Sequence, residues 1–193
     1  MADVFEWRAE LNPLRERLWR LIEATPHLDW LLLTKRPHLV SRLAPWPDWP
    51  VNVWLGSTVE DQRWAQKRIP HLAQVPAKTR FLSCEPLLGA VDLEPWRDSI
   101  DWVIAGGESG PRARPSDPEW FRSLLNQCRQ LGIPFHFKQW GEWSPVRRGS
   151  PAGKAHSNDY SVELVRLGKK QSGRKLDGRT WDEFPSPPAL AFA

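Results

Sequence analysis

Short apolar runs alternate with longer segments of helical periodicity along this chain. The apolar runs hold five or six residues each and occupy positions 29–34, 52–57, 80–85, 101–106 and 134–138. They lack the regular apolar–polar alternation of a half-exposed strand, which is typical of strands covered on both faces. The pattern therefore predicts five buried β-strands.

Segments with an apolar face separate these runs. They cover residues 11–24, 38–43, 59–73 and 117–131. The last has the clearest ends, because Ser116 or Asp117 suits an N-cap, Pro118 a first turn and Gly132 a C-cap. Alternating strands and helices imply right-handed crossovers and a parallel sheet. We predict an α/β fold, a partial, TIM-barrel-like (β/α) barrel of about five strand–helix units; an open sheet fits the same pattern.

The pattern changes after Gly141. Residues 144–158 are rich in Pro, Gly, Ser and Arg and predict a loop, whereas residues 161–167 alternate and predict a strand. A turn signal at Asp177-Gly178 favours a partner strand nearby and hence a β-hairpin. We expect a barrel domain over residues 1–143, with a basic loop, hairpin and tail over residues 144–193 packed on it.

Positive charge is concentrated in the same C-terminal part. Residues 147–179 contain nine Lys or Arg and three Asp or Glu, although the whole chain has a net charge of only +4. One interpretation is a phosphate-bearing partner, either nucleic acid or a nucleotide. The other is a solvated hairpin rich in lysine. The sequence leaves both open.

Composition narrows the class of protein further. With 40% hydrophobic residues and no long apolar run, the chain is expected to be cytoplasmic and to have no membrane partner. Several of the 13 tryptophans, such as Trp54 and Trp102, lie in strand runs, where core packing explains them. The only cysteines, Cys84 and Cys128, are too few for a zinc or iron–sulfur site, and we expect two buried thiols rather than a disulfide.

Polar residues follow the first two strands. Lys35 and Arg36 come after the first strand and either bind a phosphate or carboxylate or lie in a solvated turn. Ser57 ends the second strand, where capping of the next helix is favoured over a ligand contact.

Glu85 follows the third strand and immediately precedes a proline. Because proline restricts the preceding residue, this carboxylate is held in place and suits a base or a ligand contact, with Ser83 beside it. The alternative is an ion pair with Lys35 or Lys138.

The loop after the fourth strand has the strongest local signal. Gly106 and Gly107 would let backbone N–H groups approach a ligand, with Glu108 beside them. The alternative is a loop whose backbone conformation requires glycine and which contains internal Glu–Arg ion pairs. After the fifth strand, Lys138 would point into the site, Gln139 would read a polar ligand edge and Trp140 would stack on a ring. The predicted catalytic residues are Glu85, Glu108 and Lys138, and the predicted ligand-binding residues are Lys35, Arg36, Ser57, Ser83, Gly106, Gly107, Ser109, Arg112, Arg114, Gln139 and Trp140.

Taken together, the sequence segments at and around these strand ends resemble one family over nearly the whole chain. The runs DWLLLTKRP, NVWLGSTVED, RFLSCEPLLG, DWVIAGGESGPRARP and FHFKQWGEW, with LDGRTWDEFP near the end, are similar to the phage-associated, radical-SAM-like "gp thirty-seven / gp sixty-eight" family. The resemblance implies that the loop at Gly106-Gly107-Glu108-Ser109 lies near a cofactor or substrate. It also implies that the opening of the same site is faced by Glu85, Lys35, Arg36, Lys138 and Gln139.

The same resemblance implies a cofactor that this chain lacks the residues to hold. Members of the family usually begin with three closely spaced cysteines, which would bind a four-iron cluster and, through it, S-adenosylmethionine. This chain opens at MADVFEWR, without such a segment. We therefore expect no cofactor in this chain and no cluster-dependent activity from it alone.

Two classes of function remain from the sequence. The first is an enzyme that acts on nucleic acid or nucleotides through a radical-SAM-like barrel. The second is a non-catalytic protein that binds nucleic acid or a phosphate-bearing ligand, and an inactive prophage remnant is a further alternative. The oligomeric state is not encoded in any pattern of the sequence.

Overall fold

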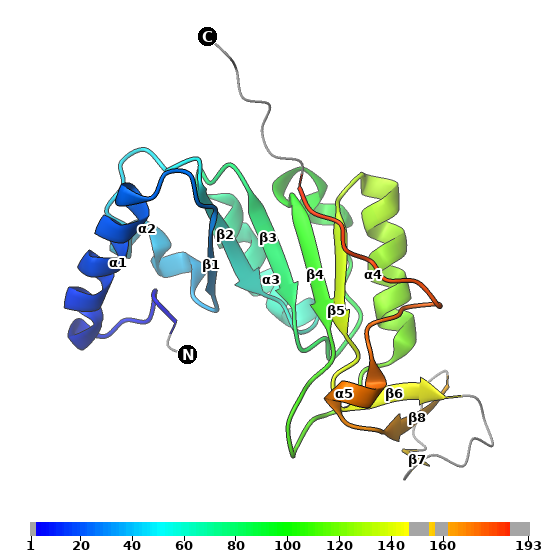
Figure 1. The fold of residues 1–193 in the computed structure, drawn as a ribbon. Coiled ribbons are helices and arrows are strands. Elements are labelled where there is room, and N and C mark those ends of the chain that lie inside the picture. The colour runs from blue at the N-terminus through cyan, green and yellow to red at the C-terminus, as the bar shows by residue number, and fades with distance from the viewer. Residues whose placement is uncertain (1–2, 147–154, 157–161, 186–193) are drawn as a thin grey trace.

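The computed structural model describes residues 3–146, 155–156 and 162–185. Its centre is a five-stranded, all-parallel sheet (Figure 1), which confirms the predicted α/β fold. The strands lie in chain order: β1 (Trp30–Thr34), β2 (Val53–Thr58), β3 (Arg80–Cys84), β4 (Trp102–Gly106) and β5 (Phe135–Gln139). Each predicted run thus forms a strand, with ends shifted by at most one residue.

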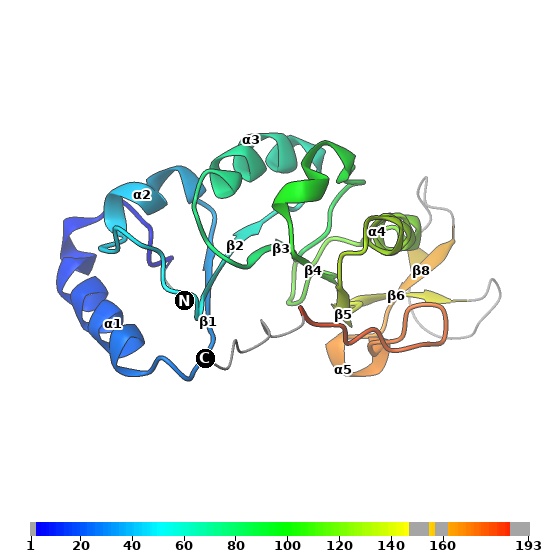
Figure 2. The same cartoon turned by 90° about the horizontal axis from the view of Figure 1, so that it is seen from above.

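Helices cover one face of this sheet. They are α1 (Asn12–Ala24), α2 (Val40–Leu43), α3 (Gln62–Ala73) and α4 (Pro118–Leu131), with 3-10 turns at Ala9–Leu11, Pro37–Leu39 and Glu94–Ser99. Seen from above, the sheet is curved, and α2, α3 and α4 lie on its convex side (Figure 2). Right-handed crossovers between neighbouring strands place every connecting helix on the same face, as in a section of a (β/α) barrel.

Local signals set the ends of the helices. Of the two N-cap candidates, Ser116 and Asp117, it is Asp117 that accepts a hydrogen bond from the backbone N–H of Glu119, and Gly132 ends α4 with φ of 69° as predicted. The start of α3 differs from the prediction, because its N-cap is Asp61, which accepts from the N–H of Trp64 at 3.0 Å. Ser57 cannot cap this helix because it lies within β2.

Alternate strand residues face the two sides of the sheet. The main core lies on the helix side, where residues such as Leu55 and Phe137 are fully buried. A smaller cluster of Trp54, Phe81 and Trp102 covers the concave face, with Trp54 and Trp102 in edge contact. The concave side chains of β1, Leu31 and Leu33, are 46% and 41% exposed. The expected covering of both faces therefore does not extend to β1.

The outer edge of β5 is covered by the C-terminal segment. The N–H of Phe137 donates to the carbonyl of Trp181 at 2.9 Å, and the indole N–H of Trp102 donates to the carbonyl of Glu183. This part of the predicted tail is therefore packed on the sheet, while residues 186–193 lie outside the described part. Within the described residues, no strand pairs with the opposite edge of the sheet, at β1.

A second, antiparallel sheet follows β5. It contains β6 (Trp143–Val146), β8 (Glu163–Arg166) and β7 (Ala155–His156) in the order β6-β8-β7. The predicted strand at 161–167 is confirmed as β8, but the loop predicted over 144–158 contains β6 and β7, and its other residues lie outside the described part. The predicted partner strand near Asp177 was wrong, because β8 pairs with β6 and β7. The turn itself is present, closed by a single Leu176–Arg179 bridge.

Both cysteines are free and buried in the main core. Burial raises the pKa of both thiols, that of Cys128 to about 12, so both are protonated at neutral pH. Across the described residues, none of the helices is both long and apolar enough to cross a membrane.

Candidate functional site

The carboxyl ends of the five parallel strands lie along one edge of the sheet, near the N-terminal segment at one end and the helix α5 (Lys169–Ser172) at the other (Figure 1). We call this edge the strand-end edge. Parallel α/β folds build their ligand sites at this position. Its polar side chains come from all five strand ends: Lys35, Arg36, Glu60, Glu85, Glu108, Lys138 and Gln139.

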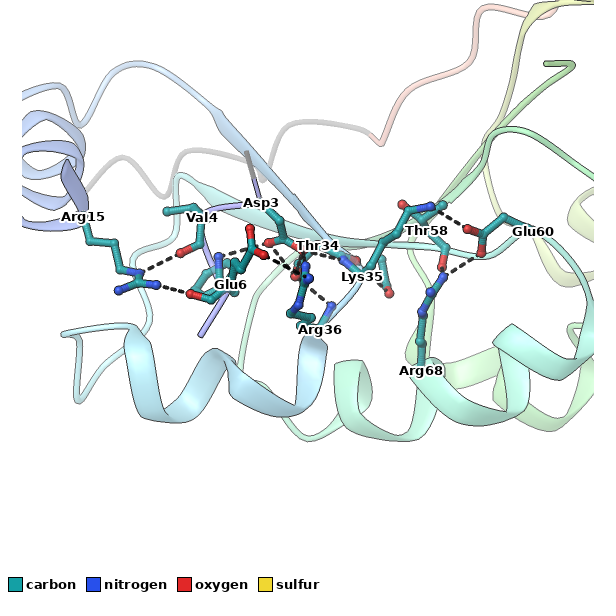
Figure 3. A network of polar contacts seen from close by, with 12 residues as sticks. Asp3, Val4, Glu6, Arg15, Thr34, Lys35, Arg36, Thr58, Glu60 and Arg68 are labelled. Carbon is teal, nitrogen blue, oxygen red and sulfur yellow. Dashed lines mark hydrogen bonds and ion pairs between the residues drawn. The ribbon is translucent and has the colours of Figure 1, made fainter. Parts of the chain in front are cut away.

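Glu60 joins the ends of β1 and β2 (Figure 3). Its Oε1 accepts from the Lys35 ammonium at 2.7 Å, and its Oε2 accepts from the Arg68 guanidinium at 2.6 Å. Arg68 also donates to the carbonyl of Thr58, and its guanidinium group lies over the ring of Trp64. The side chains of Glu60 and Arg68 are about 10% and 8% exposed, whereas that of Lys35 is 53% exposed. A buried pair thus holds one exposed ammonium at the edge.

The charge state of Glu60 depends on these partners. Burial by itself would raise its pKa, but the hydrogen bond from Lys35 and the positive charge of Arg68 outweigh burial, and the net pKa is lowered. A carboxylate whose pKa is lower in the folded state stabilises the fold above its unfolded pKa of about 4.3, and this contribution is lost as the pH falls through the folded pKa.

We therefore expect the free energy of unfolding to fall as the pH drops below about 4.5. Glu108, whose pKa is also lowered, contributes in the same direction. Urea denaturation at a series of pH values measures the effect. The acid-side slope should be smaller in Glu60→Gln, and an unchanged slope would contradict the role assigned to this carboxylate.

The N-terminal segment closes the β1 end of the edge. Asp3 accepts hydrogen bonds from the hydroxyl of Thr34 at 2.9 Å, the N–H of Lys35 at 2.9 Å and the guanidinium of Arg36 at 3.1 Å. Arg15 holds the segment from the other side by donating to the carbonyl of Val4 at 2.8 Å (Figure 3). The sequence did not reveal this role of Asp3, because about thirty residues separate it from its partners.

A pocket of about 340 Å³ opens beside this network. Its lining residues are Asp3, Glu6, Leu33, Thr34, Lys35, Arg36 and Thr58. Small-ligand pockets have volumes of roughly 300–1,000 Å³, so this one has room for part of a drug-sized molecule. It combines both signs of charge with one apolar wall.

Glu85 and Lys138 pair between the ends of β3 and β5. The Lys138 ammonium donates to Glu85 Oε2 at 3.2 Å, which settles which of the two predicted lysines Glu85 contacts. Strand β4 lies between them, and a Cβ on its last residue, Gly106, would stand 2.7 Å from Glu85 Oε1. The missing side chain at Gly106 therefore leaves space for the pair to cross. The Glu85 side chain is 18% exposed and that of Lys138 is 55% exposed.

The loop after β4 is held by contacts within the chain. A Cβ on Gly107 would overlap the carbonyl oxygen of Trp140, so this glycine permits a close approach of two backbones. Glu108 accepts three hydrogen bonds from Arg114, one from its N–H at 2.7 Å and two from its guanidinium at 2.8 and 2.7 Å. These bonds lower the pKa of Glu108 against the opposing effect of burial. The internal Glu–Arg pair left open by the sequence is therefore present.

The remaining predicted residues differ in their access to the edge. Gln139 donates to the hydroxyl of Ser109 at 3.2 Å, so these two meet. Arg112 is exposed and forms no ion pair with the described part of the chain. Ser57 is fully buried and donates to the carbonyl of Thr34. Ser83, on β3, is 4% exposed.

Trp140 lies in the core rather than at the edge. Its ring is 6% exposed and packs edge-on against Phe121 and Phe137, and its indole N–H donates to the carbonyl of Lys175 at 2.8 Å. In this arrangement no face of the ring is open for stacking on a ligand.

The thiols do not fit the iron–sulfur cluster that the family resemblance implies. Such a cluster needs three closely spaced thiolates, whereas Cys84 and Cys128 are the only cysteines and are both protonated in the core. Across residues 3–146, 155–156 and 162–185, no three His, Cys, Asp or Glu side chains are grouped to hold a metal ion.

These features define an α/β protein with an all-parallel sheet, a separate antiparallel sheet and a polar strand-end edge. Residues 1–185 match the family model described as "Protein of unknown function (DUF5131)", and the chain belongs to this family. No curated protein and no solved structure matches the chain. The family description includes neither a phage nor a radical-SAM name.

Proposed function

We propose that the strand-end edge binds a nucleotide and forms one wall of an enzyme active site. The observation that carries this proposal is the arrangement of exposed ammonium groups, Lys35 and Lys138, each held by a more buried carboxylate. An ammonium has three hydrogen-bond donors, and each lysine uses one of them on its glutamate. The other donors are available to a phosphate.

The alternation of charge along the edge favours a nucleotide over a bare anion. Glu60 and Glu85 stand beside the two ammonium groups, so a simple anion would meet repulsion as well as attraction. A nucleotide has phosphate oxygens for the lysines and ribose hydroxyls or base amines for the carboxylates. The pocket beside Lys35 and Thr34 provides an apolar wall for a ring.

Glu85 and Lys138 are the residues to which we assign acid–base chemistry. They lie 3.2 Å apart in the part of the edge between β3 and β5, and the Lys138 ammonium is half exposed. A proton can pass between such a pair and a bound substrate. Glu108 is occupied by Arg114 and has a lowered pKa, so it shapes the loop instead.

The sequence resemblance to the phage-associated, radical-SAM-like family supports an enzyme rather than a passive binder. The curved parallel sheet, with α2, α3 and α4 on its convex face, is compatible with that class of barrel. The cysteines of this chain do not fit the cluster, and the role proposed for the edge does not depend on one.

Isothermal titration of the protein with nucleoside 5′-monophosphates tests the proposal. Loss of a hydrogen bond to a charged group costs about 1.5–3 kcal/mol, so Lys35→Gln and Lys138→Gln should each weaken binding about 10- to 100-fold. The control is Lys78→Gln, which removes an exposed lysine near the start of β3, at the opposite edge of the sheet. No binding to the unaltered protein, or equal weakening by the control, would refute the proposal.

A further inference from the structure

A group of unpaired cations lies beside the strand-end edge. Lys169, Lys170, Lys175 and Arg179 are exposed, and none forms an ion pair with the described residues. We call these four residues the basic surface. In contrast, Lys35, Arg36, Arg114 and Lys138 at the edge are each paired with a carboxylate. The basic surface therefore has unpaired positive charge that these four edge residues lack.

Two acidic residues of the same segment, Asp177 and Asp182, already have cationic partners. Asp177 accepts from the guanidinium of Arg122 at 2.7 Å and lies in the turn before Arg179. Asp182 is paired with Arg174. The four cations therefore keep most of their attraction for an external anion.

Backbone contacts fix the basic surface to the end of β5. The N–H of Trp140 donates to the carbonyl of Gly173 at 3.2 Å, and its indole N–H donates to the carbonyl of Lys175 at 2.8 Å. Helix α5, which carries Lys169 and Lys170, lies next to the carboxyl end of β5 (Figure 1) and on the concave side of the sheet (Figure 2). It therefore adjoins the end of the edge where Lys138 is located.

We propose that the ligand is single-stranded nucleic acid, with its phosphate backbone on the basic surface and one nucleotide at the strand-end edge. This inference rests on the proposed function and adds that the bound nucleotide is part of a nucleic-acid strand. Several regularly spaced phosphates suit a run of unpaired cations better than one phosphate does. A single strand is favoured because a base in a duplex must first be extruded to reach such an edge.

Fluorescence anisotropy with a labelled oligonucleotide of about twelve nucleotides tests this inference. On single strands, each neutralised phosphate contributes about −0.7 to the slope of log K against log salt concentration. Four cations predict a slope of about −3 between about 50 and 300 mM KCl. The double variant Lys169→Ala/Lys170→Ala should reduce the slope by about 1.4 and weaken binding at low salt by at least about tenfold.

Arg63→Ala/Lys67→Ala is the matched control. It also removes two exposed positive charges, but from α3 on the convex side. Salt-independent binding, an equal loss in this control or tighter binding of the duplex would overturn the inference. Thermal melts of each variant confirm that the fold is retained.

Titration with a nucleoside monophosphate separates this inference from the proposed function. The Lys169→Ala/Lys170→Ala variant should bind the mononucleotide as the unaltered protein does, because neither lysine is placed in the nucleotide site. If the unaltered protein binds the mononucleotide but shows no salt-dependent binding of the oligonucleotide, only the inference that the ligand is a nucleic-acid strand is refuted. If the unaltered protein binds neither the mononucleotide nor the oligonucleotide, the nucleotide site itself is refuted.

Discussion

Replacement of Glu60 by glutamine is expected to lower the free energy of unfolding by about 3–5 kcal/mol. The carboxylate is the shared partner of Lys35 and Arg68, and the Arg68 side chain is 8% exposed. Arg68 Nε is already buried without a hydrogen-bond partner among the described residues. Glutamine keeps the shape of the side chain but leaves the guanidinium charge without its counter-charge in a site from which water is largely excluded.

Urea denaturation followed by tryptophan fluorescence measures this loss. Glu94→Gln is the control, because Glu94 and Arg97 form an exposed pair with side chains 60% and 54% exposed. Exposed pairs contribute about 0–1 kcal/mol, so the control should change little. A Glu60→Gln effect as small as that of the control would show that the buried pair does not stabilise the fold.

Substitution of Gly107 by alanine should cost at least about 3 kcal/mol. The added Cβ would overlap the carbonyl oxygen of Trp140, which is backbone and has no rotamer through which to move away. The same region carries a second close approach, since a Cβ on Gly141 would overlap the carbonyl oxygen of Glu108. Both the loop after β4 and the exit from β5 would have to shift.

Gly132→Ala separates this steric effect from a conformational one. Gly132 has a φ of 69° but has open space around its missing Cβ, so alanine there should cost only about 1–2 kcal/mol. Thermal and urea melts of the two variants provide the comparison. Equal losses would mean that the contact between Gly107 and Trp140 is less tight than the structure indicates.

The Glu60→Gln and Gly107→Ala variants also test the proposed nucleotide site. Glu60 holds the ammonium of Lys35, and Gly107 fixes the loop that carries Glu108. A loss of stability in either variant would therefore be accompanied by weaker nucleotide binding if the proposed site is correct. The control variants Glu94→Gln and Gly132→Ala lie outside the edge and should bind as the unaltered protein does.

The strand-end charges were predicted in kind, and their ion pairs only as one of two alternatives. The sequence placed Glu85 and Lys138 at strand ends, yet 53 positions separate them, and only the order β3-β4-β5 brings them together across Gly106. Gly106 and Gly107, at the end of β4, suggested a ligand contact, whereas the structure fills the space beside them with Glu85 and Trp140. A sequence shows that a side chain is missing, but not what occupies the space.

The sequence by itself determined the five strands of the parallel sheet, the best-capped helix and the α/β class, because apolar runs, Asp117-Pro118 and Gly132 act through the nearest residues of the chain. Tertiary structure alone decided that Asp3 closes the end of β1, that Arg68 lies buried against Glu60 and that β8 pairs with β6. These contacts depend on which strands become neighbours and on which face each side chain lies. Both follow from burial of the whole sheet against its helices, which no local pattern specifies.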